Sequence, residues 1–435
     1  MRGRIPRPAR VSVWTAAAVA FTLTGTLTAC SSSSDNVGSD AKQTIRFVWW
    51  GNEDRAEATE KAVALFEKKH PNIKVNTEFS GYPAYVQKLT TQIAGGAAPD
   101  LLQLDRPTFG EYQQKHQLAD LSTYMGKSLK TDKIPANLLA GGKSDKGQYA
   151  MPAGLTTELV VYDKELFSKA GVTVPENGWT WKQFEADMVK VKKKTGRAGM
   201  SDFGWSADLF ETWLHQRGKA LYASKTKLGF TKDDLAEYWN MLGSLRQKKA
   251  VTSPQVTTKS DGSVQNSPLV AKESASETSY DSGVTSYATT YQGGTIGLAP
   301  LPTDSKTASG MPALPPVYYG VSQHSSHKDA AALLMNFLVN DPEAGKVLGT
   351  TRGTPANSDN MDAICADSTG PDKQTCDFQK KMADRLMPSD TWFWPSGSAA
   401  LKSDFQRVFD EVIFGKTSVS EGAAKVVENA EQGLS

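Results

Sequence analysis

A regular alternation of strand and helix patterns near the start of the chain most constrains its fold. The first segment, Thr-Ile-Arg-Phe-Val-Trp-Trp, is rich in β-branched and aromatic residues and ends at Gly51, which is typical of a buried strand. The next segment has apolar side chains at helical spacing and ends before Pro71. The order strand, helix, strand, helix, strand predicts a parallel, doubly wound α/β sheet. The segments are residues 44–50, 54–69, 73–79, 85–94 and 100–104.

The alternation continues less regularly along the rest of the chain. Further strands are expected at residues 149–151, 157–162, 295–299 and 317–322. Further helices are expected at residues 164–170, 181–194, 208–217, 232–249, 328–339, 401–414 and 418–432. The polar, Ser/Thr/Gly-rich residues 253–283 fit short helices or loops better than low complexity.

The first residues have the pattern of a secretory signal peptide. Four arginines precede a mostly apolar run from Val11 to Leu27, and Leu-Thr-Ala-Cys follows, ending at Cys30. That ending resembles the lipobox of bacterial lipoproteins, which implies removal of residues 1–29 and lipidation of Cys30 by acyl chains such as palmitate. An ordinary signal peptide with an incidental cysteine is the alternative. We expect residues 30–43 to be a flexible tether, because they are small and polar.

Size and charge limit what the remaining chain can do. From Cys30 onward it has 435 − 29 = 406 residues, which favours two domains. Removing the four signal-peptide arginines changes the formal net charge from +2 to about −2. A value near zero argues against binding to nucleic acid or to a membrane surface, both of which need clustered basic residues. No second apolar run reaches the length of a membrane span.

Two cysteines remain after Cys30. Cys365 and Cys376 are eleven positions apart in a polar segment, so in an exported protein we expect a disulfide. A zinc pair is the weaker alternative, because no histidine lies close by in the sequence.

Six stretches, in the same order, resemble the extracellular solute-binding proteins of ABC sugar importers (family 1, maltose-binding-like). Examples are Phe-Glu-Lys-Lys-His-Pro-Asn-Ile-Lys-Val at the first helix-to-strand joint and Ile-Gly-Leu-Ala-Pro-Leu-Pro at a strand that crosses between lobes. One such stretch is weak evidence, and six in order are strong. They are residues 66–75, 89–100, 161–171, 296–302, 336–345 and 352–356.

The resemblance implies the two-lobe periplasmic-binding-protein fold. Each α/β lobe is then a doubly wound sheet flanked by helices, and a multi-strand hinge joins the lobes around a ligand cleft. We expect residues 44–153 and 296–350 in the N-terminal lobe, and residues 154–295 and 351–435 in the C-terminal lobe. It also implies a monomeric carbohydrate receptor, anchored on the outer face of the cell membrane. Such a receptor delivers its ligand to ABC permease subunits served by a separate ATPase chain, since no P-loop occurs here.

Aromatic side chains suit a sugar ligand, because an apolar ring stacks on the C–H face of a pyranose. The chain has ten tryptophans and thirteen tyrosines, several of them near predicted strand ends. The resemblance places ligand-binding residues after strands, at helix starts and at the lobe crossings. They are Trp50, Asn52, Glu53, Tyr82, Asp105, Arg106, Thr157, Glu158, Trp205, Asp208, Tyr280, Asp281, Tyr319, Arg352, Trp392 and Trp394.

Each of these residues also has a structural alternative. An aromatic side chain can belong to the core, and a charged one can lie in a solvated loop or form an ion pair between the lobes. The run Trp392-Phe393-Trp394 before Pro395 favours the functional interpretation locally, because three adjacent rings in a loop cannot all point inward.

The sequence has no pattern that indicates catalysis, a metal or another cofactor. A glycosidase needs two carboxylates at a set distance, and no segment marks such a pair. The five histidines are scattered, and His324 and His327 lack an evident third ligand. No G-x-S-x-G elbow occurs. We therefore expect a binding protein and not an enzyme, while a surface glycan-processing lipoprotein and a sensor or scaffold subunit remain the alternatives.

Overall fold

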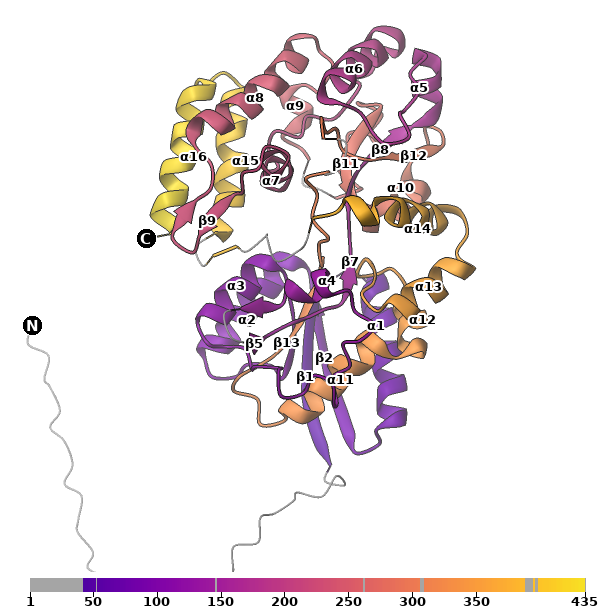
Figure 1. The fold of residues 1–435 in the computed structure, drawn as a ribbon, viewed down its shortest axis with the longest axis vertical. Helices are drawn as coiled ribbons and strands as arrows, with labels where there is room; N and C mark the ends of the chain where they lie inside the picture. Colours follow the sequence, from indigo (N-terminus) through magenta and orange to yellow (C-terminus); the bar gives the residue numbers. More distant parts are fainter. Residues whose placement is uncertain are drawn as a thin grey trace, which may run out of the picture. The chain divides into compact units, whose positions relative to one another are not determined.

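The computed structural model describes residues 42–51, 53–144, 147–260, 263–305, 309–387, 394–395 and 398–434. The predicted signal peptide, Cys30, most of the tether, Asn52 and Trp392 lie outside these residues. The described chain forms two α/β lobes, each with its own hydrophobic core (Figure 1).

The first lobe contains a five-stranded sheet in the order β2-β1-β3-β13-β6. Strand β1 (Gln43–Trp50) pairs in parallel with β2 (Ile73–Ser80) and β3 (Leu101–Leu104), as the alternating pattern predicts. Strand β13 (Tyr318–Val321) pairs antiparallel with β3 and with β6 (Met151–Pro152).

Helices cover both faces of this sheet, because side chains of β1 alternate between the faces. Ile45, Phe47 and Trp49 join one core cluster with residues of α1 (Glu53–Lys69) and α11 (Lys328–Asn340). Val48 joins a second cluster with residues of α2 (Tyr82–Ala94) and α3 (Arg106–Gln114). The doubly wound arrangement therefore follows from one short strand that is apolar on both sides.

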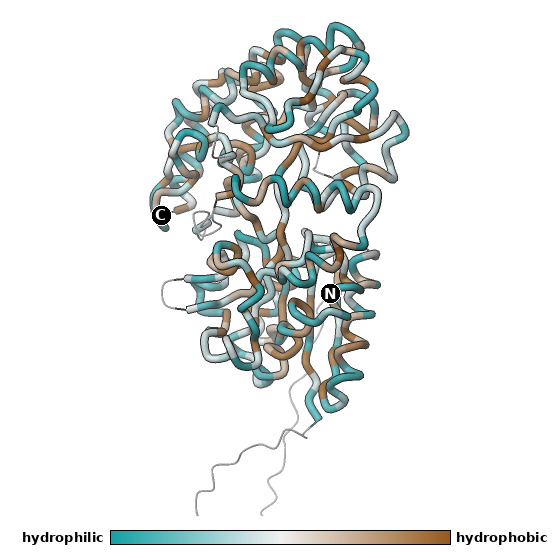
Figure 2. The backbone as a smooth tube through the Cα atoms, turned by 45° about the vertical axis from the view of Figure 1, so that its right-hand side comes forward, coloured by the Kyte–Doolittle hydropathy of each residue, from teal (hydrophilic) through white to brown (hydrophobic). Residues whose placement is uncertain are grey.

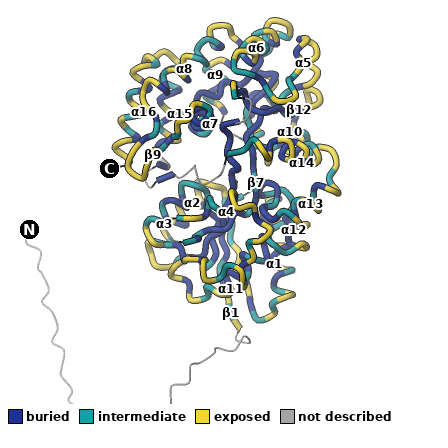
Figure 3. Tube along the Cα trace, viewed as in Figure 1, coloured by how far each residue is buried: buried dark blue, intermediate teal, exposed yellow. Residues whose placement is uncertain are grey.

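The second lobe is built on a three-stranded antiparallel sheet in the order β11-β8-β12. The central strand β8 (Glu158–Asp163) lies between β11 (Ser276–Tyr280) and β12 (Ile296–Ala299). Figure 3 shows that the buried segments gather at the two lobe cores and along the connections between them.

Helices surround the second sheet. Several pack against its core with an apolar stripe, and the alternating hydrophilic and hydrophobic positions along them are visible in Figure 2. They are α5 (Lys164–Ala170), α6 (Trp181–Thr195), α7 (Ala207–His215), α8 (Lys232–Gln247), α10 (Val284–Thr290), α15 (Ala399–Ile413) and α16 (Val419–Gly433).

Two features of the second lobe differ from the sequence prediction. Strand β11 lies in the polar segment that predicted loops or short helices; its buried Ser276 is satisfied by donating to the Gly199 carbonyl at 2.6 Å. Residues 296–305 and 309–311, expected in the N-terminal lobe, belong to the second lobe by their contacts. Strand β12 pairs with β8, and Leu301 and Met311 lie in the second core.

Short strands connect the lobes. Strand β7 (Gly154–Leu155) pairs with β14 (Thr354–Pro355), and Thr156 forms a bridge to Leu314. Gly154 has to be glycine here, because a Cβ atom would lie 2.2 Å from the Arg352 carbonyl oxygen. The hinge strands therefore approach more closely than a side chain would allow.

A disulfide joins Cys365 of α13 (Ser358–Asp367) to Cys376 of α14 (Gly370–Met382). Within the described residues, no helix combines the length and apolarity that crossing a membrane requires. The remaining short elements are α4 (Ala136–Ala140), β4 (Lys143–Ser144), β5 (Gly147–Gln148), β9 (Tyr222–Ser224), β10 (Lys227–Leu228), α9 (Pro254–Thr257), α12 (Pro342–Leu348) and the 3₁₀ turns Asp281–Gly283 and Ala383–Arg385.

Candidate functional site

A cavity of about 120 Å³ lies in the second lobe, where β8, β11 and the start of α7 meet. Glu158 begins β8 and Tyr280 ends β11, and the antiparallel register places these two residues opposite each other. Trp205 precedes α7, whose N-cap Ser206 accepts a hydrogen bond from the Leu209 amide. The cavity is lined by Glu158, Ser201, Trp205, Ser206, Asp208, Leu209, Ser260, Glu277, Thr278, Ser279 and Tyr280.

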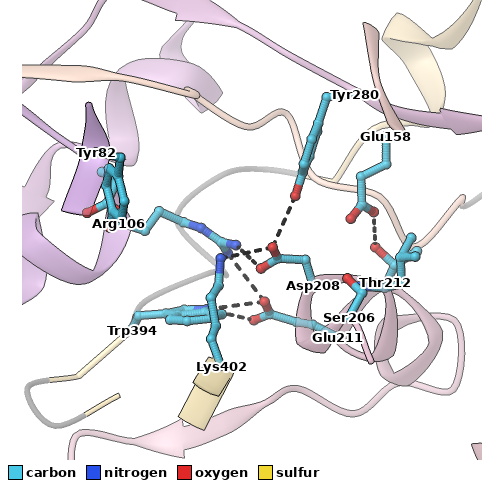
Figure 4. Close-up of polar contacts among 12 residues, drawn as sticks. Tyr82, Arg106, Glu158, Ser206, Asp208, Glu211, Thr212, Tyr280, Trp394 and Lys402 are labelled. Atoms are coloured by element: carbon cyan, nitrogen blue, oxygen red, sulfur yellow. Dashed lines mark hydrogen bonds and ion pairs between the residues drawn. The ribbon is translucent and has the colours of Figure 1, made fainter. Parts of the chain in front are cut away.

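Asp208, in the first turn of α7, is the centre of a polar network at this cavity (Figure 4). It accepts a hydrogen bond from the Tyr280 hydroxyl at 3.1 Å and forms an ion pair with Lys402 at 2.9 Å. Arg106 approaches the other carboxylate oxygen at 2.9 Å. Burial alone would raise the pKa of Asp208, but Lys402 and Arg106 outweigh it and lower the pKa. Asp208 is therefore ionised at neutral pH.

Arg106 connects the two lobes. It is the first residue of α3 in the first lobe, and its guanidinium also contacts Glu211 of α7 at 3.3 Å. It lies over the Trp394 ring, with 4.7 Å from Cζ to the ring centroid. Burial acts to lower the pKa of Arg106, but Glu211 and Asp208 together raise it. For Arg106 and Asp208, the structure shows the interlobe ion pair that was the alternative to ligand binding.

Two acidic side chains beside Asp208 titrate at unusually high pH. Burial raises the pKa of Glu158 to about 8, although the Thr212 hydroxyl donates a hydrogen bond to its carboxylate. Burial raises the pKa of Glu211 to about 7, although Arg106 and the Trp394 indole N–H favour its ionised form. Glu158 is therefore mostly protonated at neutral pH, which lets this cavity wall donate a hydrogen bond as well as accept one.

An aromatic group lies on the first-lobe side. The Trp50 ring, at the end of β1, meets Tyr82 edge-on, with ring centroids 5.5 Å apart. Tyr82 is 42% exposed, and its hydroxyl donates to Asp105, the N-cap of α3. In Figure 4, Tyr82 and Arg106 both lie on the side of the network that faces away from α7. Glu53 is an exposed residue at the start of α1.

The structure therefore brings together only part of the predicted set. Glu158, Trp205, Asp208 and Tyr280 line the cavity, and Arg106 contacts it through Asp208. Trp394 is 1% exposed beneath Arg106, so its ring is not an open stacking platform.

Four other predicted residues lie away from the cavity. Thr157 is buried at the crossing. Asp281 accepts hydrogen bonds from Thr156 at 2.6 Å and from Gln379 at 2.7 Å, which makes it part of the hinge. Tyr319 of β13 and Arg352, which precedes β14, are buried in the first lobe.

Glu211, Lys402 and Glu277 belong to this site but were not predicted from the sequence. Glu211 follows Asp208 by three positions on a helix, and this spacing places both carboxylates on the same face. That signal was available in the sequence. Lys402 and Glu277 gave no signal, because only the tertiary fold brings Lys402 to Asp208 and Glu277 to the cavity wall. In the part of the chain that is described, no three His, Cys, Asp or Glu side chains are grouped so that they could hold a metal ion.

These features are those of a two-lobe binding protein with a polar and aromatic cavity beside its hinge. Residues 50–345 match the bacterial extracellular solute-binding protein family, and the chain belongs to that family.

A solved family 1 extracellular solute-binding protein from Alicyclobacillus acidocaldarius is 30% identical, with a TM-score of 0.73 over 91% of this chain and 99% of that chain. Two curated relatives come from Streptomyces. The diacetylchitobiose binding protein DasA of Streptomyces coelicolor is 31% identical over 30% of this chain and 29% of its own length. An uncharacterised lipoprotein of Streptomyces antibioticus is 26% identical over 38% of this chain and 36% of its own length. The chain spans about a third of the length of the curated relatives that it matches.

Proposed function

We propose that this solute-binding protein captures a neutral mono- or oligosaccharide between its lobes and delivers it to the membrane permease of an ABC importer. The observation that carries the proposal is the cavity in which Trp205 and Tyr280 stand beside Glu158 and Asp208. Aromatic rings next to hydrogen-bonding groups suit a ligand with apolar C–H faces and an edge of hydroxyls.

The charges of the cavity favour a neutral ligand over an acidic one. Asp208 is already compensated by Arg106 and Lys402, and Arg106 is engaged by two carboxylates. An acidic sugar would have to compete with Asp208 and Glu211 for these cations. DasA, one of the relatives, is named for diacetylchitobiose, a neutral disaccharide, which supports the same class.

The proposal includes lipid anchoring at Cys30 and no catalysis. The Leu-Thr-Ala-Cys sequence supports the anchor, and so does the relative that is named a lipoprotein. Anchoring on the outer face of the membrane would keep the receptor near its permease. Metabolic labelling with an alkyne palmitate analogue should mark the wild-type protein but not Cys30→Ser.

Intrinsic fluorescence and calorimetric titration test the sugar. The panel contains diacetylchitobiose, cellobiose, maltose, the corresponding monosaccharides and, as other classes, a tripeptide and spermidine. We expect saturable binding of at least one neutral sugar, with no product after prolonged incubation. Binding of the peptide or spermidine alone would refute the sugar assignment, and turnover would favour the glycan-processing alternative.

Two matched variants localise the binding. Trp205→Ala should weaken sugar affinity about 10-fold to 100-fold, the range for losing an aromatic anchor. Phe414→Ala removes a large exposed ring at the end of α15 and should leave affinity unchanged. Equal affinity in the wild type and Trp205→Ala would show that the ligand binds elsewhere.

A further inference from the structure

Arg352 is a buried cation, and its hydrogen-bond acceptors among the described residues are uncharged. It lies between α12 and β14 and is 4% exposed. Its Nε donates to the Gln103 side-chain oxygen at 2.9 Å, and its Nη2 donates to the Thr59 hydroxyl at 2.9 Å. Burial lowers the pKa of Arg352, and the Tyr319 phenol acts in the opposite direction. Arginine nevertheless stays charged, so a positive charge is enclosed in this core.

A second guanidinium makes the surroundings more positive. Arg55 of α1 donates to the Thr351 carbonyl at 3.0 Å and to the Trp50 carbonyl at 3.1 Å. Burial and the neighbouring Arg352 lower the pKa of Arg55 to about 10. Enclosed charges are strongly unfavourable unless a counter-charge accompanies them. For Arg352, no carboxylate among the described residues supplies that counter-charge.

Two unused hydrogen-bond donors belong to the residues around one small cavity. Arg352 Nη1 and the Tyr319 hydroxyl are fully buried, and neither has a partner among the described residues. Both residues line a cavity of about 20 Å³. Among the described residues, no Asp or Glu lines it; its other walls include Ala153, Leu338, Gly353 and Asn360. This volume holds one water molecule or one monoatomic ion.

We propose that this cavity binds one chloride-sized monovalent anion, held by Arg352 Nη1 and the Tyr319 hydroxyl. A water molecule would satisfy the two donors but leave the charge uncompensated, whereas a small anion satisfies both. A carboxylate or a phosphate is too large for the space. The cavity touches Ala153, just before β7, and Gly353, just before β14, so the anion would brace the two hinge strands against the first-lobe core.

The thermal stability of the whole mature protein tests the proposal without any sugar. Unfolding is followed in sodium chloride and in sodium isethionate at the same pH and ionic strength, because isethionate is larger than chloride and does not resemble a sugar. We expect the Tm to rise with chloride concentration and saturate about 5 °C above the isethionate value. Bromide should replace chloride, and a bromide-soaked crystal should show an anomalous peak between Arg352 and Tyr319.

Two Tyr→Phe variants separate the site from general salt effects. Tyr319→Phe keeps the ring but removes one donor, so it should weaken the apparent chloride affinity about tenfold. Tyr162→Phe, at a half-buried tyrosine of the second lobe, should keep the wild-type chloride response. Equal Tm values in chloride and isethionate, or density without an anomalous bromide signal, would overturn the proposal in favour of water.

Discussion

Replacing Glu158 by glutamine should remove a pH-dependent destabilisation that the buried carboxyl imposes on the fold. Burial raises the pKa of Glu158 from its ordinary value of 4.5 to about 8, so the folded protein holds this proton more tightly than the unfolded chain does. The stabilisation that follows is fully present below pH 4.5 and is lost progressively as the pH rises from 4.5 to about 8. Glutamine has the shape of the protonated acid and cannot ionise.

The size of the effect follows from the two pKa values. With 4.5 for the unfolded chain and about 8 for the folded protein, Glu158 alone lowers the free energy of unfolding by about 3 kcal/mol between pH 6 and pH 9. Glu211, with a pKa of about 7, loses stabilisation in the same direction. The wild type should therefore become less stable over this range, and Glu158→Gln should lose about 3 kcal/mol less.

Urea unfolding, followed by tryptophan fluorescence at pH 6, 7.5 and 9, measures this difference. At pH 6 the variant should already be about 2 kcal/mol more stable than the wild type, because Glu158 is ionised in the unfolded wild-type chain and protonated in the folded protein. Glu60→Gln, at an exposed residue of α1, is the control and should follow the wild-type pH profile. If the wild type gained stability from pH 6 to pH 9, or if Glu158→Gln were less stable than the wild type at pH 9, Glu158 would not be a buried neutral acid.

Three further variants test the connections around the site. Arg106→Met removes the contacts to Asp208 and Glu211, so small-angle scattering of the ligand-free protein should show a larger radius of gyration; an unchanged radius would contradict a role of the pair in lobe closure. Asp281→Asn replaces the acceptor of the Thr156 and Gln379 hydrogen bonds and should lower the free energy of unfolding by about 1–3 kcal/mol, measured in urea. The double variant Cys365→Ser with Cys376→Ser opens the disulfide loop and should lower the free energy of unfolding by about 3 kcal/mol. Reducing the disulfide of the wild type should lower it by the same amount.

The first-lobe sheet could be predicted from the sequence because its elements are strongly periodic. Residues 44–50 and 73–79 are close to the observed strands Gln43–Trp50 and Ile73–Ser80. Strand β11 could not be predicted, because Ser-Glu-Thr-Ser-Tyr has little apolar signal. Its buried polar side chains are satisfied by groups distant in sequence, such as the Gly199 carbonyl, and local patterns do not contain that information.

The resemblance predicted several of the residues that line the cavity, because these lie at the ends of strands and helices. It was less successful for residues whose side-chain position depends on contacts between distant segments. Trp205, Asp208 and Tyr280 come together because α7 begins beside the end of β11. Arg352 illustrates the opposite outcome. Its position after a crossing predicted a ligand contact, but its side chain turns into the first-lobe core towards Gln103 and Thr59. Whether a crossing residue faces the cleft or the core depends on side-chain direction, which a sequence pattern does not fix.

The interlobe ion pairs should contribute less to lobe closure than a bound sugar does. Asp208 keeps Lys402 and Tyr280 as partners within its own lobe when Arg106 leaves, so it does not become an isolated charge. Arg106 in turn gains water when the lobes separate, and this hydration offsets much of the attraction that it loses. A sugar seated against Trp205 has no such compensation, because its apolar contact area returns to water on release. Arg106→Met should therefore weaken sugar affinity less than Trp205→Ala does, and the reverse order would show that the ion pair, and not the ligand, provides most of the free energy of closure.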